Sequence, residues 1–307
     1  MVAAGRSLMV LCWHNVEGTW CFPSASGAGR SGLERQLRAL RSATNIVPLG
    51  WALQAMSDGL ALPPRALAIT FDDGYRDNLT LAVPLLCMLR IPATCFLVPG
   101  ILSGDVVPWW ERLAWAFAEA QADHVELDRQ RVMLCSDSDR YAVFQKVAAQ
   151  LKGRERRHRE SAVDELAVRL APAGEYRAQD QFLDWDGARE LQKHMEIGSH
   201  SMYHSILSRE TTQAQHEDLA DSRRQLVDGL DTDIRLLAYP NGTKIDYNAD
   251  TFVAAEQAGY TYALTTEYGW NTRSTNRYEI RRWVIRPERG VFELGKILRD
   301  MVWRARR

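Results

Sequence analysis

The sequence predicts an α/β protein whose strands close into a distorted barrel of the (β/α)7 type with a helical insertion. Short strand-like runs alternate with amphipathic helical segments along most of the 307 residues, which is typical of a parallel sheet. The composition, 46% hydrophobic and 25% charged, is that of a folded globular protein. An open doubly wound sheet is the competing architecture, but no GxGxxG or GxxxxGK[ST] directly follows a candidate strand, so nucleotide binding has no support.

The alternating part contains the elements of the expected barrel. Its strand candidates are short runs in which apolar and β-branched residues predominate, and its helix candidates have apolar residues three and four positions apart. The expected strands are Leu8–Trp13, Ala66–Phe71, Ala93–Val98, Glu196–Ser199, Ile234–Tyr239, Thr261–Thr265 and Trp283–Arg286. The expected helices are Leu33–Ala43, Leu79–Leu89, Asp186–His194, Thr211–Leu230 and Ala249–Ala258.

The alternation stops between Ser103 and Gln181, where the sequence is helical in character and no strand is expected. Its mixed-charge run KGRERRHRE (152–160) is interpreted as a solvated helix face. Three parts are therefore expected: a discontinuous barrel (1–102 and 182–289), a helical insertion or cap (103–181) and a C-terminal amphipathic helix (290–307).

Three tryptophans stand at the start of the insertion. Trp115 is expected to pack the insertion onto the barrel, whereas Trp109 and Trp110 are equally compatible with packing and with lining a sugar-binding cleft. Both are retained as candidate substrate contacts.

Partners and compartment follow from charge, apolar runs and cysteines. A net charge of −1 gives no reason to expect nucleic acid as a partner. The start lacks the pattern of a secretory signal, and the five cysteines form no CxxC pair, so a cytoplasmic protein with reduced thiols is expected. The basic segment 290–307 has two interpretations, a helix that closes the barrel or a helix on the inner face of a membrane.

Two adjacent carboxylates end one of the expected strands. AITFDDGYRDN (68–78) leads directly into Asp72, Asp73 and Gly74. Gly74 permits a sharp turn that can aim both carboxylates at the C-terminal rim of the barrel, where barrel enzymes keep their active sites. Taken alone, Asp-Asp-Gly is also an ordinary turn sequence, so the segment needs a partner.

His200 and His204 supply that partner, because they follow another expected strand in EIGSHSMYHSIL (196–207). On a helical turn their spacing puts both imidazoles on one face, although two such histidines are also common as surface or core residues. One aspartate with two histidines is the ligand set of a catalytic divalent metal, with a position left for water. A non-heme Fe(II) oxygenase can use the same ligand types, but the α/β alternation does not suggest the double-sheet barrel of that class.

With these motifs the sequence resembles the polysaccharide deacetylases of the NodB-homology type, carbohydrate esterase family 4. TFDDG (70–74) matches the first family motif, HSMYH (200–204) the second, and LAYPNG (237–242) is similar to the third. The resemblance covers Ser7–Val98 and Phe182–Arg286 and leaves the insertion uncovered. It implies a distorted barrel of about seven βα units.

The resemblance also implies roles for individual residues. Asp72 would be the general base, and Asp73, His200 and His204 would hold one divalent metal ion, Zn²⁺ before Co²⁺, Ni²⁺ or Mn²⁺. In the family a backbone N–H of the third motif stabilises the oxyanion, which places this role on the amide of Tyr239, with Pro240 fixing the loop and counted as a substrate contact.

Two departures from the family pattern lead to two further expectations. No histidine follows His216, so the general acid of the late family motif is absent, and His14, at the end of the first strand, is the expected substitute. This matches a branch of the family whose first strand closes with a histidine. The usual arginine of the third motif aligns with Ala238, and Arg282 is expected to pair with Asp72 in its place.

The expected function is metal-dependent hydrolytic N-deacetylation of an N-acetylated sugar, in a polysaccharide or in a lipid-linked glycan precursor. Two alternatives remain open at this level. One is a catalytically impaired glycan-binding protein that keeps the metal site, and the other is an amidohydrolase that acts on an amide outside sugars.

Overall fold

A computed structural model describes residues 7–127, 129–285 and 295. The large sheet runs in the order β10-β1-β3-β4-β7-β8-β9, with β2 paired to β3 and β11 paired to β1. Its strands are β1 (Ser7–Trp13), β2 (Asn45–Ile46), β3 (Ala66–Phe71), β4 (Thr94–Leu97), β7 (Glu196–Ser199), β8 (Leu236–Ala238), β9 (Tyr262–Leu264), β10 (Asn271–Thr272) and β11 (Trp283–Val284).

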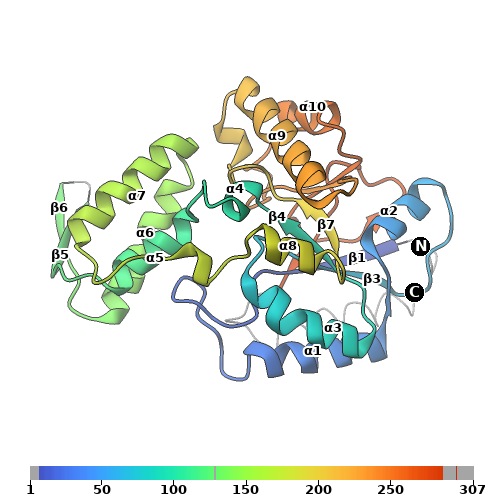
Figure 1. Cartoon of the computed structure of the whole chain (residues 1–307), viewed down its shortest axis with the longest axis horizontal. Coiled ribbons are helices and arrows are strands. Elements are labelled where there is room, and N and C mark those ends of the chain that lie inside the picture. Colours follow the sequence, from blue (N-terminus) through green and yellow to red (C-terminus); the bar gives the residue numbers. More distant parts are fainter. Residues whose placement is uncertain (1–6, 128, 286–294, 296–307) are drawn as a thin grey trace.

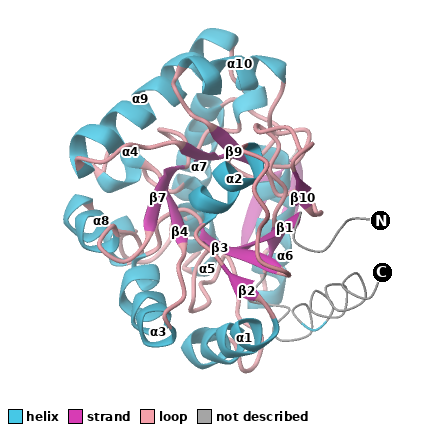
Figure 2. Ribbon diagram, turned by 90° about the vertical axis from the view of Figure 1, so that its right-hand side faces the viewer, coloured by secondary structure: helices cyan, strands magenta, loops and turns pink. Residues whose placement is uncertain are grey.

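Helices surround this sheet in the way that a βα barrel requires (Figure 1, Figure 2). They are α1 (Gly29–Ala43), α2 (Leu49–Ser57), α3 (Val83–Leu89), α4 (Pro99–Leu102), α8 (Trp185–Leu191), α9 (Thr212–Leu230) and α10 (Ala249–Gln257). A π-helical turn, Asn78–Ala82, leads into α3, and 3₁₀ turns lie at Ala178–Asp180 and Leu207–Arg209. Among the described residues, no helix combines the length and the apolarity needed to cross a membrane.

The sheet curls until its two edges are joined. Ile280 forms a parallel bridge to Leu264 on β9, and the following strand β11 pairs in parallel with β1. The chain between Ile280 and Val284 therefore links the last βα unit back to the first strand. The predicted distorted barrel is confirmed, and the strand and helix candidates of the alternating part all contain an element of the expected kind.

The barrel interior is filled by side chains that alternate along the strands. Leu8 and Val10 of β1 pack against Phe96 of β4 and against α2, which lies across the N-terminal ends of the strands. Gly198 on β7 has to be a glycine, because a Cβ there would lie 2.4 Å from the Phe96 ring. Apolar side chains thus fill the barrel at the N-terminal ends of its strands. Polar side chains converge at the opposite, C-terminal rim.

The insertion forms a lobe beside the barrel (Figure 1). It consists of α5 (Trp109–Ala118), β5 (His124–Leu127), β6 (Gln130–Met133), α6 (Asp137–Leu151) and α7 (Arg156–Leu170). The expectation of no strand in this part is wrong, because β5 and β6 form an antiparallel hairpin. Each strand of the hairpin has only four residues, and Val125 is the single buried residue among these eight, so there is no alternating pattern to detect in the sequence.

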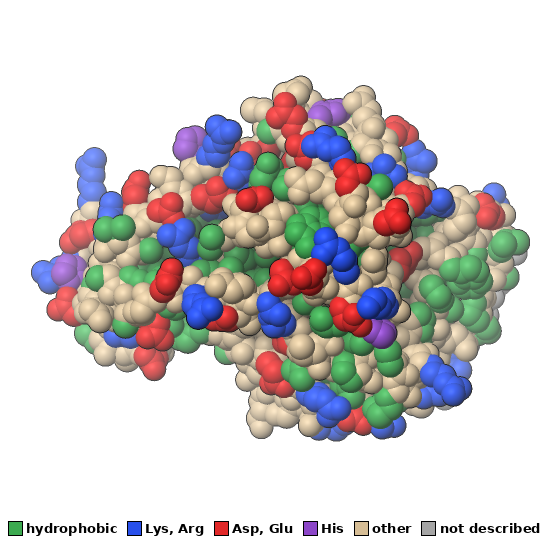
Figure 3. Space-filling model, in the orientation of Figure 1, with side chains coloured by type: hydrophobic (Ala, Val, Ile, Leu, Met, Phe, Trp, Pro, Cys, Tyr) green, Lys and Arg blue, Asp and Glu red, His purple; other side chains and the backbone are tan. Residues whose placement is uncertain are grey.

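Figure 3 shows charges of both signs interspersed on one face of the molecule, with apolar side chains gathered on the side where Figure 1 places α2. Trp51 in α2 and Leu60 after it are exposed apolar residues. The predicted amphipathic helix at 290–307 falls outside the described residues.

Candidate metal centre and its surroundings

The carboxylates of Asp72 and Asp73 reach the barrel rim because the chain turns sharply after β3. The amide of Asp72 still extends the sheet by donating to Trp13 O at 2.9 Å. Asp73 and Gly74 then adopt left-handed backbone conformations, with φ of 71° and 76°. This turn points both carboxylates to the same side, where they are 1% and 4% exposed. The role expected for Gly74 is thereby confirmed, and Asp73 shares the strained conformation.

The histidines reach the same place from β7. His200 continues the ladder by donating its amide to Leu97 O at 2.8 Å, and the chain then forms a loop rather than the helical turn expected from the spacing. Ser201 and His204 have φ of 65° and 52°. The two imidazole rings come within 5.0 Å of each other, centroid to centroid. The spacing thus correctly predicts that the two rings meet, but the helical turn that it predicts for the chain between them is wrong.

Asp73, His200 and His204 form a compact three-residue cluster. Oδ1 of Asp73 lies 3.3 Å from Nε2 of His200 and 3.3 Å from Nε2 of His204. That oxygen is buried and has no hydrogen-bond partner among the described residues. His200 Nδ1 donates to Ala238 O at 2.7 Å, which leaves the lone pair on Nε2 facing the aspartate. One carboxylate oxygen and two imidazole nitrogens around a common point are the donors that a divalent ion such as Zn²⁺ takes.

Electrostatics agree with this donor set for Asp73 and His204, whereas at His200 burial is outweighed by the charge of Asp72, which raises the pKa. Burial favours the protonated form of Asp73, but the close contacts of its carboxylate with His200 and His204 outweigh burial and hold the pKa of Asp73 well below its ordinary value. Burial lowers the pKa of His204 to about 4, so this ring is neutral at physiological pH. A charged carboxylate and a neutral imidazole are the protonation states that metal ligands need.

Arg282 holds Asp72 with both branches of its guanidinium. Nη1 donates to Oδ1 at 2.7 Å and Nη2 to Oδ2 at 2.8 Å, while Nε donates to Thr265 O at 3.0 Å. Both side chains are buried. Burial raises the pKa of Asp72 but the charge of Arg282 outweighs it, so the pKa is lowered. The contact that strand alternation predicts for Arg282 is therefore present.

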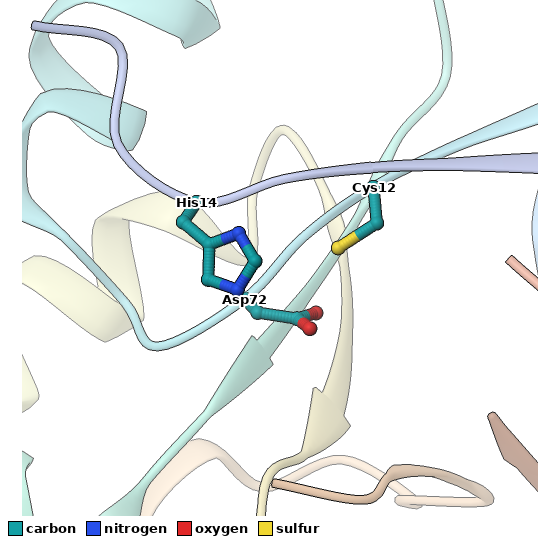
Figure 4. Close-up of side chains that lie close together, drawn as sticks. All are labelled: Cys12, His14 and Asp72. Atoms are coloured by element: carbon teal, nitrogen blue, oxygen red, sulfur yellow. The ribbon is translucent and has the colours of Figure 1, made fainter. Parts of the chain in front are cut away.

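Figure 4 shows His14 and Cys12 beside Asp72, at the end of β1. A ring nitrogen of His14, the Cys12 sulfur and a carboxylate oxygen of Asp72 lie within 4.8 Å of one another. Because Arg282 occupies both oxygens of Asp72, this trio is poorly suited to a second cation. Burial raises the pKa of Cys12 far above its ordinary value, so its thiol stays neutral. His14 is half-buried and lies on the open side of the base.

The expectation for Tyr239 is wrong. Its amide donates to Leu264 O at 3.0 Å and so extends the ladder between β8 and β9, which leaves it no free donor for an oxyanion. Pro240 is buried and Asn241 takes a left-handed conformation with φ of 59°. The buried Nδ2 of Asn241 has no acceptor among the described residues.

Trp109 and Trp110 are only 5% and 6% exposed and pack in the apolar core of the insertion, so the structure favours packing over the cleft. The Trp110 ring lies 4.3 Å from the ring of His204, centroid to centroid. Trp115 packs against the same core, as expected. The insertion therefore forms one wall of the metal centre without offering these two indoles as an open sugar platform.

Two loop anchors were not identified in the sequence. Asp218 of α9 accepts the amide of Met202 at 2.6 Å and the hydroxyl of Ser205 at 2.7 Å, which fixes the loop between the two histidines. Asn78 donates from Nδ2 to the carbonyl oxygen of His14 at 2.7 Å. Asn78 stands inside the quoted AITFDDGYRDN segment, whereas Asp218 gives no sequence signal beyond an acidic residue on a helix.

Glu111 was also missed, and it connects the insertion to both sides of the centre. Its Oε1 accepts from Thr19 Oγ1 at 2.8 Å and from the Tyr75 hydroxyl at 2.9 Å. That hydroxyl in turn accepts from Trp110 Nε1 at 2.9 Å. Burial raises the pKa of Glu111 to about 7. A glutamate inside the apolar stretch WWERLAWAF is the signal that could have identified it.

Glu111→Gln is expected to make stability less dependent on pH. The folded protein binds the Glu111 proton more tightly than the unfolded chain, with a pKa of about 7 against 4.5, so its free energy of unfolding falls as pH rises between these values. The loss is about 2–3 kcal/mol for this group. Glutamine keeps the Oε1 acceptor and cannot ionise. The measurement is urea unfolding of wild type and variant at pH 5.5 and pH 8. The free energy of unfolding should change less with pH in the variant, and the variant should be more stable than wild type at pH 8. An equal change with pH in both proteins would contradict this assignment.

The comparisons with known proteins agree with this geometry. A sequence model described as polysaccharide deacetylase matches residues 156–263, which include His200 and His204 but not Asp72 and Asp73. YxkH of Bacillus subtilis (strain 168), whose name assigns it provisionally to the polysaccharide deacetylases, is 30% identical over 114 residues. That alignment covers 37% of this chain and 40% of YxkH, so the chain matches less than half of the length of this curated relative.

Solved structures show the same fold over nearly the whole chain. The Streptococcus pyogenes deacetylase PplD, in complex with acetate, superposes with a TM-score of 0.62 at 15% identity, covering 96% of this chain and 98% of that one. IcaB from Ammonifex degensii gives 0.59 at 18% identity, with 97% and 98% covered. The BpsB deacetylase domain from Bordetella bronchiseptica gives 0.57 at 19% identity, with 92% and 96% covered. With its two motifs meeting at one rim of this barrel, the chain is similar to the polysaccharide deacetylases over residues 156–263 of its sequence, and it has the fold of these deacetylase structures over nearly its whole length.

Proposed function

We propose that this protein is a metal-dependent hydrolase that removes the acetyl group from an N-acetylated sugar, in a polysaccharide or a lipid-linked glycan precursor. The observation that carries the proposal is the shared position of Asp73 Oδ1, 3.3 Å from Nε2 of both His200 and His204. A carboxylate held by an arginine stands directly beside it, at Asp72. A ligand set next to a positioned base is the arrangement that hydrolysis of an unreactive amide requires.

Asp73, His200 and His204 would hold the ion. When bound, a divalent ion lowers the pKa of water and polarises the acetyl carbonyl. Zn²⁺ suits a set of one carboxylate and two imidazoles best, and Co²⁺, Ni²⁺ or Mn²⁺ can occupy the same donors. The buried Asp73 Oδ1, which has no partner among the described residues, is the atom of this chain that most needs a cation.

Asp72 is suited to be the general base. Its lowered pKa keeps it ionised at neutral pH, and Arg282 fixes both of its oxygens in place, so the carboxylate cannot rotate away from the attacking water. Arg282 is itself held by Thr265 O and stacks 5.5 Å from the centre of the Phe96 ring. The base is thus anchored through the barrel interior rather than by a neighbouring loop.

His14 is suited to donate the proton that an amine leaving group needs. It faces Asp72 across the rim, is half-buried, and its main chain is fixed by Asn78. The charge that develops on the acetyl oxygen needs a donor other than the Tyr239 amide. Asn241 Nδ2 is the candidate on the same loop, because it is buried and has no acceptor.

Acetate release from N-acetylated sugars tests the proposal. The full chain would be incubated with N-acetylglucosamine oligomers and with uridine-diphosphate and lipid-linked N-acetyl sugars, before and after removal of metal by a chelator. We expect acetate from at least one of them, loss of release with the chelator and recovery on adding Zn²⁺. Release that survives complete metal removal, or cleavage confined to amides outside sugars, would contradict the proposal.

A further inference from the structure

Arg159, on α7, is a fully buried cation with almost no partners. It is 0% exposed, although the charge run around it was interpreted as a solvated face, so that interpretation is wrong for this residue. Within the described part of the chain, its single side-chain hydrogen bond is from Nη1 to Arg154 O, at 3.4 Å. Nε and Nη2 have no acceptor among the described residues. In the part of the chain that the structure describes, no carboxylate forms an ion pair with it.

The charge of Arg159 persists in this environment. Burial lowers its pKa only to about 10, so the guanidinium remains protonated at neutral pH. A buried charge without a counter-charge costs several kcal/mol, and proteins normally pair it. The carboxylates that act on it, Glu160 and Glu210, are already engaged by Arg156: Glu160 Oε2 accepts from its Nη1 at 3.0 Å and Glu210 Oε1 from its amide at 2.7 Å.

The neighbour of Arg159 on α5 is another unpaired donor. The Trp109 ring centre lies 5.2 Å from the guanidinium carbon, and Trp109 Nε1 is buried without an acceptor among the described residues. The unpaired atoms of this pair are therefore all donors. A guanidinium fork beside an indole N–H fits the two oxygens of a carboxylate.

This pair lies directly behind the metal centre. Trp109 contacts Trp110 with ring centres 6.2 Å apart, and Trp110 packs on His204. The first turn of α7 adjoins the loop of the two histidines, because Arg156 lies 4.3 Å from the centre of the Tyr203 ring. One layer of aromatic rings thus separates Arg159 from the proposed site of hydrolysis.

We propose that Arg159 and Trp109 bind a small carboxylate anion, and that its ligand is the acetate which the reaction releases; this choice of ligand rests on the proposed function. The size of the anion decides whether a sugar chain or a small carboxylate can bind here. With Arg159 at 0% and Trp109 at 5% exposure, a sugar chain cannot reach the donors, whereas acetate has only four heavy atoms. The reaction itself supplies such an anion next to the site.

Thermal unfolding of the metal-free full chain tests the binding without any need for activity. Sodium acetate at pH 7.5 would be compared with sodium chloride at equal ionic strength. We expect acetate to raise the Tm of wild type by about 2–4 °C more than chloride and to leave Arg159→Met unchanged. Arg169→Met, which removes the same charge from an exposed position on α7, should respond like wild type. Equal effects of acetate and chloride, or an unchanged response in Arg159→Met, would overturn the proposal.

Two further readouts separate this inference from the proposed function. In chloride, Arg159→Met should be at least as stable as wild type, because it removes an uncompensated buried charge. If the protein releases acetate from sugars, Arg159→Met should need at least about fivefold more acetate for half-maximal product inhibition. If no substrate is cleaved, the thermal measurement still decides whether the carboxylate site exists. A variant inhibited by acetate as strongly as wild type would remove the link to the product.

Discussion

Asp72→Asn is expected to lower kcat for deacetylation by about 10²–10⁴-fold, the usual contribution of a positioned general base. Asparagine has nearly the same shape but cannot take the proton from water. Binding of the metal should change little, because the ligand set lies on Asp73 and the two histidines. The measurement is acetate release by zinc-loaded variant and wild type, with the metal content of both determined on the same samples.

A matched control for Asp72→Asn is Asp186→Asn on α8, whose carboxylate is 92% exposed and pairs only with Arg189 among the described residues. It should retain wild-type turnover. Because Arg282 loses part of its partner in Asp72→Asn, circular dichroism has to show that the variant is folded. A folded, metal-loaded Asp72→Asn with turnover within a factor of three of wild type would remove Asp72 from the mechanism.

His14→Ala is expected to lower amide turnover by about 10²–10⁴-fold while the bound metal stays in place. An amine leaves only when its nitrogen is protonated, whereas the p-nitrophenolate of an activated ester leaves without help. The variant should therefore hydrolyse p-nitrophenyl acetate at a rate within about tenfold of wild type. Comparing the two substrates on one sample separates the loss of an acid from the loss of the whole site.

The control for His14→Ala is His158→Ala, which removes a 76% exposed imidazole from α7. It should be indistinguishable from wild type on both substrates. If His14→Ala lost amide and ester turnover in equal proportion, the ring would be positioning Asp72 or the substrate rather than donating a proton. Near-normal amide turnover would exclude the acid role altogether.

Much of the fold and the centre of the site can be predicted from the sequence because both are encoded locally. The strands Ala66–Phe71 and Glu196–Ser199 have the expected bounds, and the ligands follow their ends directly. Strand alternation predicts that Arg282 rather than its neighbour faces Asp72, and the structure places it there. In each case the residue lies next to the end of a strand, so the strand fixes where its main chain stands at the barrel rim.

The predictions that are wrong or absent concern contacts that only the tertiary structure determines. The Tyr239 amide is occupied because the residue that follows β8 still donates to Leu264 O at the end of β9. Arg159 lies in a run of charges that would be solvated on an isolated helix, but here it is buried, with its guanidinium over the Trp109 ring of α5. Glu111 is buried because the insertion folds back onto Tyr75. Neither composition nor periodicity carries information on such distant partners.

Metal binding to the metal-free chain tests the central claim most directly. Titration with Zn²⁺ should give one tightly bound ion per chain in wild type and in Asp72→Asn, and an affinity at least about 10²-fold weaker in Asp73→Ala and in His204→Ala. Equal affinity in wild type and in both ligand variants would show that Asp73, His200 and His204 do not form a metal centre.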